Sequence, residues 1–454
     1  MAKLMELEVP DFGRAAEPPP WRLSREAYQA RLDRLRERMD RRGWTHLVVY
    51  GDREHFANLL WTSGFDPRFE EALLIVGLRG DPLMLAGNEC VNYLPATPAP
   101  MRVERFQWFS LPSMPKDSSR TLAEILRDEG IDAHSRVGIA GWKDYDDPRR
   151  IDAPSYLVDA VRFAASWENV ENAAAIFIDP LDGLRTTATA EEIVFLEWTG
   201  TLASDGMRRV IEAVEPGALD YDLLKHVQYN GVPLGCHMTL KCGGNRVSLA
   251  SARGERVVRG GRFSCGISYW GANCCRAGWV ADGPGDLPAP ARDYIEAFAG
   301  PYFEAMAGWF QRLRIGVAGG ELHRAIHDRL GQDRFNVFLN AGHLIGFDEW
   351  ISSPVWQDSS VPLRPGMVMQ ADVIPSHPDY YSTRMEDGYA LADAFLRNEI
   401  RRISPDCLAR CEARRNWMRW SLNLPASDDI LPLTNLPGVV SPFLLNPSLL
   451  MSAR

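Results

Sequence analysis

The chain of 454 residues is longer than one ordinary hydrophobic core requires, and its 46% hydrophobic content is typical of a folded globular protein. Its 60 acidic residues outnumber its 50 basic residues, which gives a formal net charge of -10. No long run of basic residues occurs, so a nucleic-acid partner is not expected. The eight cysteines form no C-x-x-C pair, which favours free thiols in a reducing compartment.

Residues 1–23 are expected to form a Pro-rich leader. Acidic residues come early in this segment, and the apolar core of a signal peptide does not follow them. The longest apolar runs of the chain, such as HLVVY and ALLIV, have the length of strands and are too short to span a bilayer. We therefore expect a cytoplasmic protein that has no membrane partner.

Residues 24–165 are predicted to form an α/β domain. Apolar residues recur at helical spacing from Tyr28 to Met39, which predicts one amphipathic helix. The runs THLVVYG, FEEALLIVG, DPLMLAG and RVGIAG have the composition of strands, and Gly or Pro separates them. Helical segments such as SSRTLAEILRDEG alternate with these strands. A linker is expected over residues 166–184.

Residues 185–400 are predicted to form a second domain of the α+β class. A helix should begin near Thr189 and end before the tripeptide EPG, and further helices are expected at about 291–313 and 321–330. The segments ERVVRGGRFSCGISYWG and PGMVMQADVIP are expected to form strands. Residues 401–454 should form an Arg-rich helix and then an extended tail on the surface, because prolines interrupt the final segment.

Several motifs of the second half occur in an order that resembles one known family. They are the TxxE helix with its later EPG, the GGRF hairpin, GHLIGFDEW, LRPGMVMQADVIP and RMEDGYAL. Together they resemble the pita-bread superfamily, which includes creatinase, aminopeptidase P and prolidase. The segment REHFANLLWTSGF is similar to a strand-turn segment of that superfamily's smaller N-terminal α/β domain. The resemblance covers residues 24–400 and implies this two-domain architecture and a homodimer.

The resemblance also implies a set of metal ligands that this sequence only partly provides. Metalloenzymes of the family bind two metal ions through two aspartates, a histidine and two glutamates. His343 matches that histidine, and Asp372 and Glu386 match the glutamates, whereas Ser264 and Cys275 occupy the aspartate positions. Because hard divalent ions need several anionic ligands, we expect no cofactor, or at most one divalent ion held by His343, Asp372 and Glu386.

The residues that match the family's ligands have several interpretations. His343 could be a buried structural histidine hydrogen-bonded to a carbonyl, or it could be functional. His343, flanked by Asp372 and Glu386, would act as a general acid or base near neutral pH. Alternatively, the two carboxylates would clamp a guanidinium, amidine or ammonium group of a substrate, or form ion pairs with arginine. The residues expected to contact substrate are Arg68, Cys275, Arg276, Trp350 and Arg384.

Each of these substrate candidates also has a simpler interpretation. Arg276 would favour a thiolate at Cys275 and would oppose a metal ion, but a buried cysteine more often only fills space. Trp350 replaces a second histidine that contacts substrate in the family. Arg68 resembles a region that reaches the neighbouring subunit's active site in related dimers, and an exposed loop arginine explains it equally well. Arg384 and Arg276 are both candidate ion-pair partners of Asp372 and Glu386.

Other residues of the sequence are candidate ligands or pocket walls. His323 and His327 have metal-ligand spacing on a helix but no third ligand nearby in the sequence. An aromatic-lined pocket or ordinary core packing would account for Trp270, Trp279, Trp350 and Trp356. Creatinase has its catalytic histidine shortly before the hairpin, where this chain has only Ser248 and Ser251, so creatinase activity itself is not expected.

Three functions follow from these residues. The first is an aminopeptidase P/creatinase-like hydrolase of a C–N bond in a small molecule or short peptide, with a lost or reduced metal centre. The second is a metal-dependent Xaa-Pro peptidase, and the third is a non-catalytic protein that binds a ligand or partner in the same cleft. Activity that survives chelation would distinguish the first function from the second.

Overall fold

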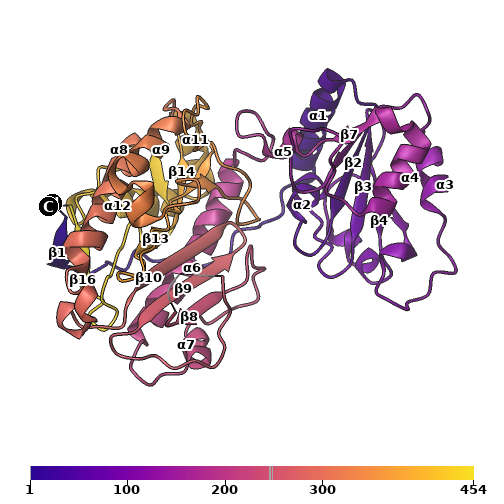
Figure 1. The fold of residues 1–454 in the computed structure, drawn as a ribbon. Coiled ribbons are helices and arrows are strands. Elements are labelled where there is room, and N and C mark those ends of the chain that lie inside the picture. Colours follow the sequence, from indigo (N-terminus) through magenta and orange to yellow (C-terminus); the bar gives the residue numbers. More distant parts are fainter. Residues whose placement is uncertain (1, 245–246, 248, 454) are drawn as a thin grey trace. The chain divides into compact units, whose positions relative to one another are not determined.

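The computed structural model describes residues 2–244, 247 and 249–453. The chain divides into two compact units, one of residues Pro20–Arg185 and one that joins Met1–Pro19 to Thr186–Arg454 (Figure 1). Among the described residues, no helix combines the length and the hydropathy that a bilayer span requires.

The Pro20–Arg185 unit is built on a six-stranded mixed sheet with the order β5-β4-β3-β2-β6-β7. The central strand β2 pairs antiparallel with β3 and parallel with β6. Its strands are β2 (His46–Gly51), β3 (Ala72–Gly77), β4 (Leu83–Ala86), β5 (Arg102–Arg105), β6 (Val137–Ala140) and β7 (Val170–Asn172). Its helices are α1 (Arg25–Arg42), α2 (Ala57–Ser63), α3 (Leu122–Asp128), α4 (Ser155–Ala165) and α5 (Ala175–Ile178).

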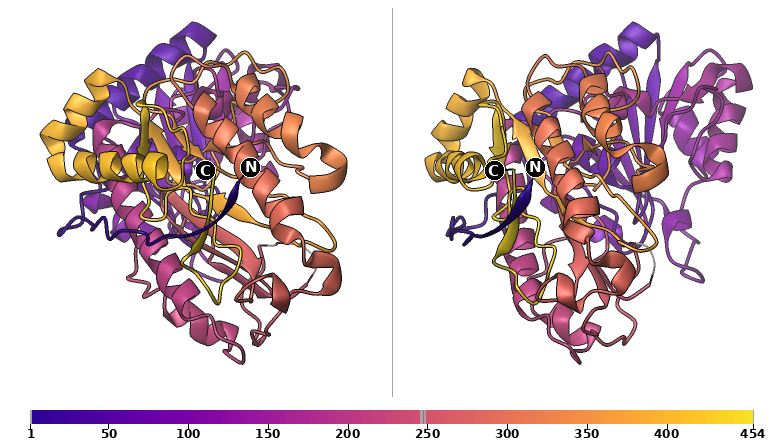
Figure 2. Two further views of the ribbon diagram at one scale, coloured as in Figure 1. Left: turned by 90° about the vertical axis from the view of Figure 1, so that its left-hand side faces the viewer. Right: turned by 60° about the vertical axis from the view of Figure 1, so that its left-hand side comes forward.

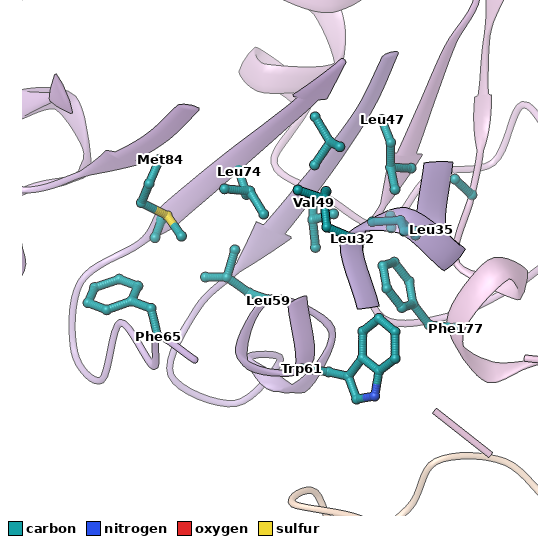
Figure 3. Close-up of a cluster of buried hydrophobic side chains, with 14 of the residues drawn as sticks. Leu32, Leu35, Leu47, Val49, Leu59, Trp61, Phe65, Leu74, Met84 and Phe177 are labelled. Atoms are coloured by element: carbon teal, nitrogen blue, oxygen red, sulfur yellow. The ribbon is translucent and has the colours of Figure 1, made fainter. Parts of the chain in front are cut away.

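Alternating side chains of the central strands explain why helices cover both faces of this sheet. Val49 of β2 belongs to a buried cluster with Leu32 of α1, Leu59 of α2 and Phe177 of α5 (Figure 3). Its neighbour Val48 belongs to a second cluster, which includes residues of α3 and α4. The α/β character expected for this half of the chain is confirmed.

The expectation of a linker over residues 166–184 is wrong. Strand β7 lies in this range and extends the sheet by parallel pairing with β6. Helix α5 also lies in this range, and its Phe177 is fully buried in the core. A strand of three residues is too short for a period-two pattern to reveal it in the sequence.

The other unit contains two four-stranded sheets and a two-stranded sheet, and the strand orders are β13-β10-β9-β8, β11-β12-β14-β15 and β1-β16. The strands are β1 (Lys3–Glu6), β8 (Thr239–Cys242), β9 (Arg262–Tyr269), β10 (Ala272–Trp279), β11 (His343–Leu344), β12 (Val368–Gln370), β13 (Arg384–Glu386), β14 (Gly388–Leu391), β15 (Ile430–Pro432) and β16 (Leu449–Ser452). The helices are α6 (Ala190–Glu212), α7 (Asp220–Lys225), α8 (Gly300–Arg312), α9 (Gly319–Leu330), α10 (Gln332–Phe335), α11 (Ala394–Ile403) and α12 (Pro405–Trp420), and a π-helical turn (Ile295–Ala299) precedes α8.

Helix α6 covers one face of the sheet that carries β9 and β10 (Figure 1). It begins at Thr189, which forms a reciprocal capping box with Glu192. A Cβ atom added at Gly206 of this helix would lie 3.4 Å from Ile267 Cδ1, so Ile267 of β9 faces α6. Because side chains alternate along a strand, Ser264 of β9 points to the opposite face of the sheet.

The two ends of the described chain meet in one small sheet. β1 pairs antiparallel with β16, and Figure 2 shows the indigo β1 next to the yellow C-terminal segment. Residues 1–23 therefore do not form a separate leader. The tail is not a surface segment either, because β15 pairs with β14 and the apolar side chains of Val440 and Phe443 are buried.

Candidate active site

One face of the β9–β10–β13 sheet gathers the polar residues of the candidate site. Cys275 of β10 is the register partner of Glu386 of β13. Because cross-strand partners point to the same face and alternate residues do so too, Asn273 and Arg384 share this face. Ser264 of β9 shares it as well, through the pairing of β9 with β10. This face is the one that α6 leaves uncovered.

His343 lies in β11 and is fully buried next to two carboxylates. Its Nε2 atom is 3.2 Å from Glu349 Oε1 and 3.9 Å from Asp372 Oδ2. The Trp350 ring stacks on the imidazole, with the ring centroids 4.0 Å apart and the planes at 16°. The imidazole is thus held between an aromatic ring and two anionic groups.

Arg384 and Asn273 connect the carboxylates of the site. The Arg384 Nη2 atom forms ion pairs with Glu386 and, at 3.6 Å, with Asp372 Oδ1. The Asn273 amide donates a hydrogen bond of 2.7 Å to Glu386 Oε1, and its nitrogen lies 3.4 Å from Glu349 Oε1. The ion-pair interpretation of Asp372 and Glu386 therefore applies with Arg384 as the partner.

Charge and burial act in opposite directions on the pKa values of this site. Burial opposes protonation of His343, but the Glu349 and Asp372 charges outweigh it and raise the pKa of the imidazole. Burial also opposes ionisation of Glu349, yet the facing imidazole lowers the pKa of Glu349. Burial raises the pKa of Asp372, and Arg384 opposes this shift. His343 and Glu349 therefore favour the charged pair near neutral pH.

The donor set does not fit a pair of divalent cations. Ser264 and Cys275 supply no anion on the site face, because burial raises the pKa of the Cys275 thiol far above its usual range. The thiol also lies 3.3 Å from Asn273 Oδ1, to which it donates. The site could hold a single ion, because ligand atoms of His343, Glu349 and Glu386 lie within 4.8 Å of one another. Such an ion would compete with Arg384 and Asn273 for Glu386.

A second group of metal-compatible side chains consists of Glu197, Cys407 and Cys411. The Glu197 carboxylate already accepts hydrogen bonds from Arg410 at 2.9 and 2.7 Å and forms an ion pair of 2.7 Å with Arg414. Because two guanidinium groups neutralise this carboxylate, the cluster fits a structural ion network and not a metal centre.

The same arrangement of elements occurs in solved structures. The prolidase from Pyrococcus horikoshii OT3 matches with a TM-score of 0.63 and 14% identity, over 80% of this chain and 95% of that chain. The Xaa-Pro dipeptidase from Bacillus anthracis matches with 0.62 and 13%, over 81% and 96% of the two chains. A variant of Escherichia coli aminopeptidase P matches with 0.57 and 14%, over 82% and 93%.

The chain has the pita-bread fold of creatinase and aminopeptidase P. This confirms the fold that the order of sequence motifs predicted. No family model matches the sequence, and no curated protein matches it either. The likeness to the solved structures is therefore one of fold, and the chemistry must be argued from the residues of this chain.

Arg276 does not belong to the pita-bread site, which corrects the sequence-based expectation. It follows Cys275 directly, so its side chain points to the opposite face of the sheet. There its Nη2 atom lies 2.8 Å from Asp387 Oδ2 and donates to the Leu436 carbonyl. It donates to the main-chain oxygen of Cys275 and has no described contact with the thiol. Arg276 is a buried structural cation that neither activates Cys275 nor opposes a metal ion.

The other predicted residues lie in varied surroundings. Arg68 belongs to the Pro20–Arg185 unit, where its 55% exposed side chain pairs with Asp66 at 3.1 Å, as an exposed loop arginine would. His323 and His327 stack on each other at 4.0 Å and belong to none of the three-residue ligand groups found among the described residues. Ser251 is exposed, and Ser248 lies outside the described residues.

The four tryptophans expected around the site have different neighbours. Trp350 stacks on His343. Trp270 packs edge-on against Phe347, Trp279 packs against Tyr294, and Trp356 is 40% exposed. Core packing, the other interpretation that the sequence allowed, thus describes the printed contacts of Trp270 and Trp279, whereas Trp350 lies at the site.

Sequence reasoning missed Glu349 and Asn273. Glu349 directly precedes Trp350 in the motif GHLIGFDEW, but the motif gave no reason to orient it toward His343. Asn273 could have been found, because it lies two residues before Cys275 in the hairpin and must share its face. Both residues contact members of the predicted set.

Proposed function

We propose that the chain is a hydrolase of an amide or amidine C–N bond in a small molecule or short peptide, working with at most one metal ion. The observation that supports this best is the buried imidazole of His343, 3.2 Å from Glu349 and 3.9 Å from Asp372 on a pita-bread scaffold. Similar structures carry the names prolidase, Xaa-Pro dipeptidase and aminopeptidase P, which agrees with a hydrolase of this kind.

The charged pair divides the chemistry of hydrolysis between two residues. Cleavage of a C–N bond needs a base that takes a proton from water and an acid that protonates the leaving nitrogen. Ionised Glu349 would serve as the base, and protonated His343 would serve as the acid. Asn273 and Arg384 would keep Glu386 and Asp372 in place without taking part in proton transfer.

Hydrolysis assays with and without a chelator test the proposal. The full chain is incubated with a panel of Xaa-Pro dipeptides, N-acyl amino acids and amidines, and products are detected by mass spectrometry. We expect cleavage that survives EDTA and is lost in His343→Asn, whereas His323→Asn, a half-buried histidine outside the site, retains it. Full activity of His343→Asn would refute the assignment. Ligand binding without cleavage would support a non-catalytic protein instead.

A metal-dependent Xaa-Pro peptidase is the second candidate. It is favoured by the group of His343, Glu349 and Glu386, whose ligand atoms lie within 4.8 Å of one another. Bound to this group, an ion would supply a water of lowered pKa as the nucleophile. Elemental analysis of protein purified without added metal separates the two candidates, because this second function requires one ion per chain and activity that EDTA abolishes.

The remaining expectations concern assembly and location. A homodimer and a cytoplasmic location remain predictions, as does the lack of nucleic-acid and membrane partners. Light scattering coupled to gel filtration tests the homodimer, since a dimer would have twice the chain mass of 50.9 kDa.

A further inference from the structure

We propose that His323 and His327 of α9 form a binding site for one divalent transition metal ion that prefers nitrogen ligands, such as Ni²⁺, Cu²⁺ or Zn²⁺. This site shares no residue with the candidate active site, and the inference does not depend on the proposed function. It concerns two histidines whose spacing in the sequence is that of metal ligands.

The two imidazoles lie together on one side of α9 (Figure 1). His323 and His327 are four residues apart, and side chains with this spacing on a helix point in nearly the same direction. Their rings stack with the centroids 4.0 Å apart and the planes at 26°. Two histidines spaced in this way on a helix bind one ion in the H-E-x-x-H motif of zinc enzymes. The structure therefore brings two nitrogen ligands to one place.

α9 holds these rings on a side that solvent can reach. A Cβ atom added at Gly308 of α8 would lie 3.9 Å from Ala325 Cβ, so Ala325 marks the side of α9 that packs against α8. His323 and His327 are two residues before and after Ala325. Because each residue advances about 100° around the helix axis, both histidines lie on the other side of α9. They are half-buried there, so an ion from solvent can reach them while a packed helix fixes their spacing.

The ring nitrogens of this pair have no competing partners within the described part of the chain. There, each imidazole contacts the other ring but forms no hydrogen bond or ion pair. Other histidines of the protein differ in this respect. His46 Nε2 lies 3.0 Å from the Glu129 carbonyl oxygen, and His55 Nδ1 lies 3.2 Å from Asp52 Oδ2. An ion at His323 and His327 would therefore displace no protein contact of these rings.

Two carboxylates make the surroundings of the pair favourable for a cation. Burial and the neighbouring His327 lower the pKa of His323, whereas the Asp358 and Asp328 carboxylates oppose this shift. Both carboxylates therefore lie within electrostatic range of the ring. A Cβ atom added at Gly320 would lie 3.3 Å from the main-chain carbonyl carbon of Asp358, so Asp358 lies against the first turn of α9. His323 follows Gly320 by three residues and lies on nearly the same side of the helix.

The ligand set selects the class of ion. Imidazole suits Cu²⁺, Ni²⁺ and Zn²⁺, whereas Mg²⁺, Ca²⁺ and Mn²⁺ prefer oxygen ligands. Arg324 is the cation next to His323 in the sequence, but it forms an ion pair with Glu321, which offsets its charge. Structural zinc sites usually have four protein ligands, so water would fill the remaining positions here. We therefore expect weaker binding than at a four-ligand zinc site.

Titration of the EDTA-treated full chain with Ni²⁺ and with Mn²⁺ in a calorimeter tests the inference. We expect the wild type to bind Ni²⁺ at least tenfold more tightly than Mn²⁺. His323→Asn and His327→Asn should each weaken this Ni²⁺ binding at least tenfold. His134→Asn removes an exposed, unpaired histidine and should bind Ni²⁺ like the wild type. His343→Asn should also keep this binding, which separates the pair from the candidate active site.

Thermal unfolding provides a second measurement. An ion that binds only the folded chain stabilises it, so saturating Ni²⁺ should raise the melting temperature of the wild type and not that of His323→Asn or His327→Asn. Circular dichroism checks that every variant is folded. The inference would be overturned by Ni²⁺ affinity that is unchanged in both variants or equal to that for Mn²⁺. A loss in only one of the two variants would indicate a single surface histidine and would also overturn it.

Discussion

Cys275 and Glu386 are register partners in neighbouring antiparallel strands, so a thiol and a carboxylate share one face of the sheet. Burial raises the pKa of the Cys275 thiol far above its usual range. We therefore predict that Cys275 is unreactive. Iodoacetamide at neutral pH should modify the half-buried Cys236 first in peptide mass mapping, and Cys275→Ser should keep any hydrolytic activity. Labelling of Cys275 at the rate of a free thiol would contradict this.

Adding carboxylates on the same face should create a metal site. Cys275→Asp would place an anion opposite Glu386, and Ser264→Asp would add a second on the same face, opposite Ala277 and in line with Arg384; divalent ions require such additional anions. We predict at least tenfold tighter Mn²⁺ binding by calorimetry than in the wild type. The matched control is Ser264→Asn with Cys275→Asn. Asparagine has nearly the volume of aspartate but no charge, so the control should bind Mn²⁺ no more tightly than the wild type. A folded double-aspartate variant without a gain in affinity would show that charge is not what limits metal binding here.

Glu197 should be a major contributor to stability in the pita-bread unit. Its carboxylate is 1% exposed and neutralises Arg410 and the fully buried Arg414. Glu197→Gln leaves both guanidinium groups without an anion, so we expect the free energy of unfolding in urea to fall by about 3–5 kcal/mol. Glu399→Gln breaks an exposed ion pair with Arg402 and should lower the free energy of unfolding by less than about 1 kcal/mol. Equal effects of the two changes would refute the structural role of the network.

Asp220 should make stability depend on acidic pH. Burial opposes its ionisation, but four backbone N–H groups, those of Arg253, Glu255, Gly254 and Tyr221, outweigh it and lower the pKa of the carboxyl. A lowered folded-state pKa stabilises the protein above the unfolded pKa of about 3.9, and this contribution is lost as pH falls through the folded value.

The variant Asp220→Asn tests this dependence. At pH 7 we expect the free energy of unfolding of this variant to be about 1–3 kcal/mol lower than that of the wild type, because an amide cannot accept all four hydrogen bonds. The difference from the wild type should shrink below about pH 4, where the wild-type carboxyl takes up its proton. Urea unfolding measured across this pH range would show it, and a difference that stays constant with pH would contradict the prediction.

Gly200 of α6 is needed because the helix approaches the backbone closely. A Cβ atom at this position would lie 2.3 Å from the Leu433 carbonyl oxygen. Gly200→Ala should therefore lower stability by about 1–3 kcal/mol, although alanine favours helices by about 1 kcal/mol. Gly308→Ala in α8, where the nearest atom would be 3.6 Å away, should be neutral or stabilising. Thermal unfolding of both variants checks the contrast.

Local sequence signals predicted the elements that carry strong local patterns. The apolar spacing from Tyr28 to Met39 predicted α1, and the capping residue Thr189 marked the start of α6. The motif order also predicted the fold and named His343, Asp372 and Glu386, which the structure brings together. These successes rest on patterns within a few residues or on motifs that survive divergence.

Features that depend on long-range pairing could not be predicted in the same way. β7 has three residues and β11 has two, so neither has enough length for periodicity to identify it. The position of Glu349 next to His343 depends on the loop after β11. By contrast, the sequence could have shown that Arg276 does not share the site with Cys275, because adjacent residues of a strand point to opposite faces of the sheet.

The pairing of β1 with β16 has a consequence for biosynthesis. β16 is synthesised long after β1, so β1 has no strand partner while the elements between them are made. Until then, Arg208 of α6, which donates to the carbonyls of Val9 and Pro10, offers the earliest anchor for this segment. Closure of this small sheet therefore comes late in folding, because it joins two strands from distant parts of the sequence and cannot precede the synthesis of β16.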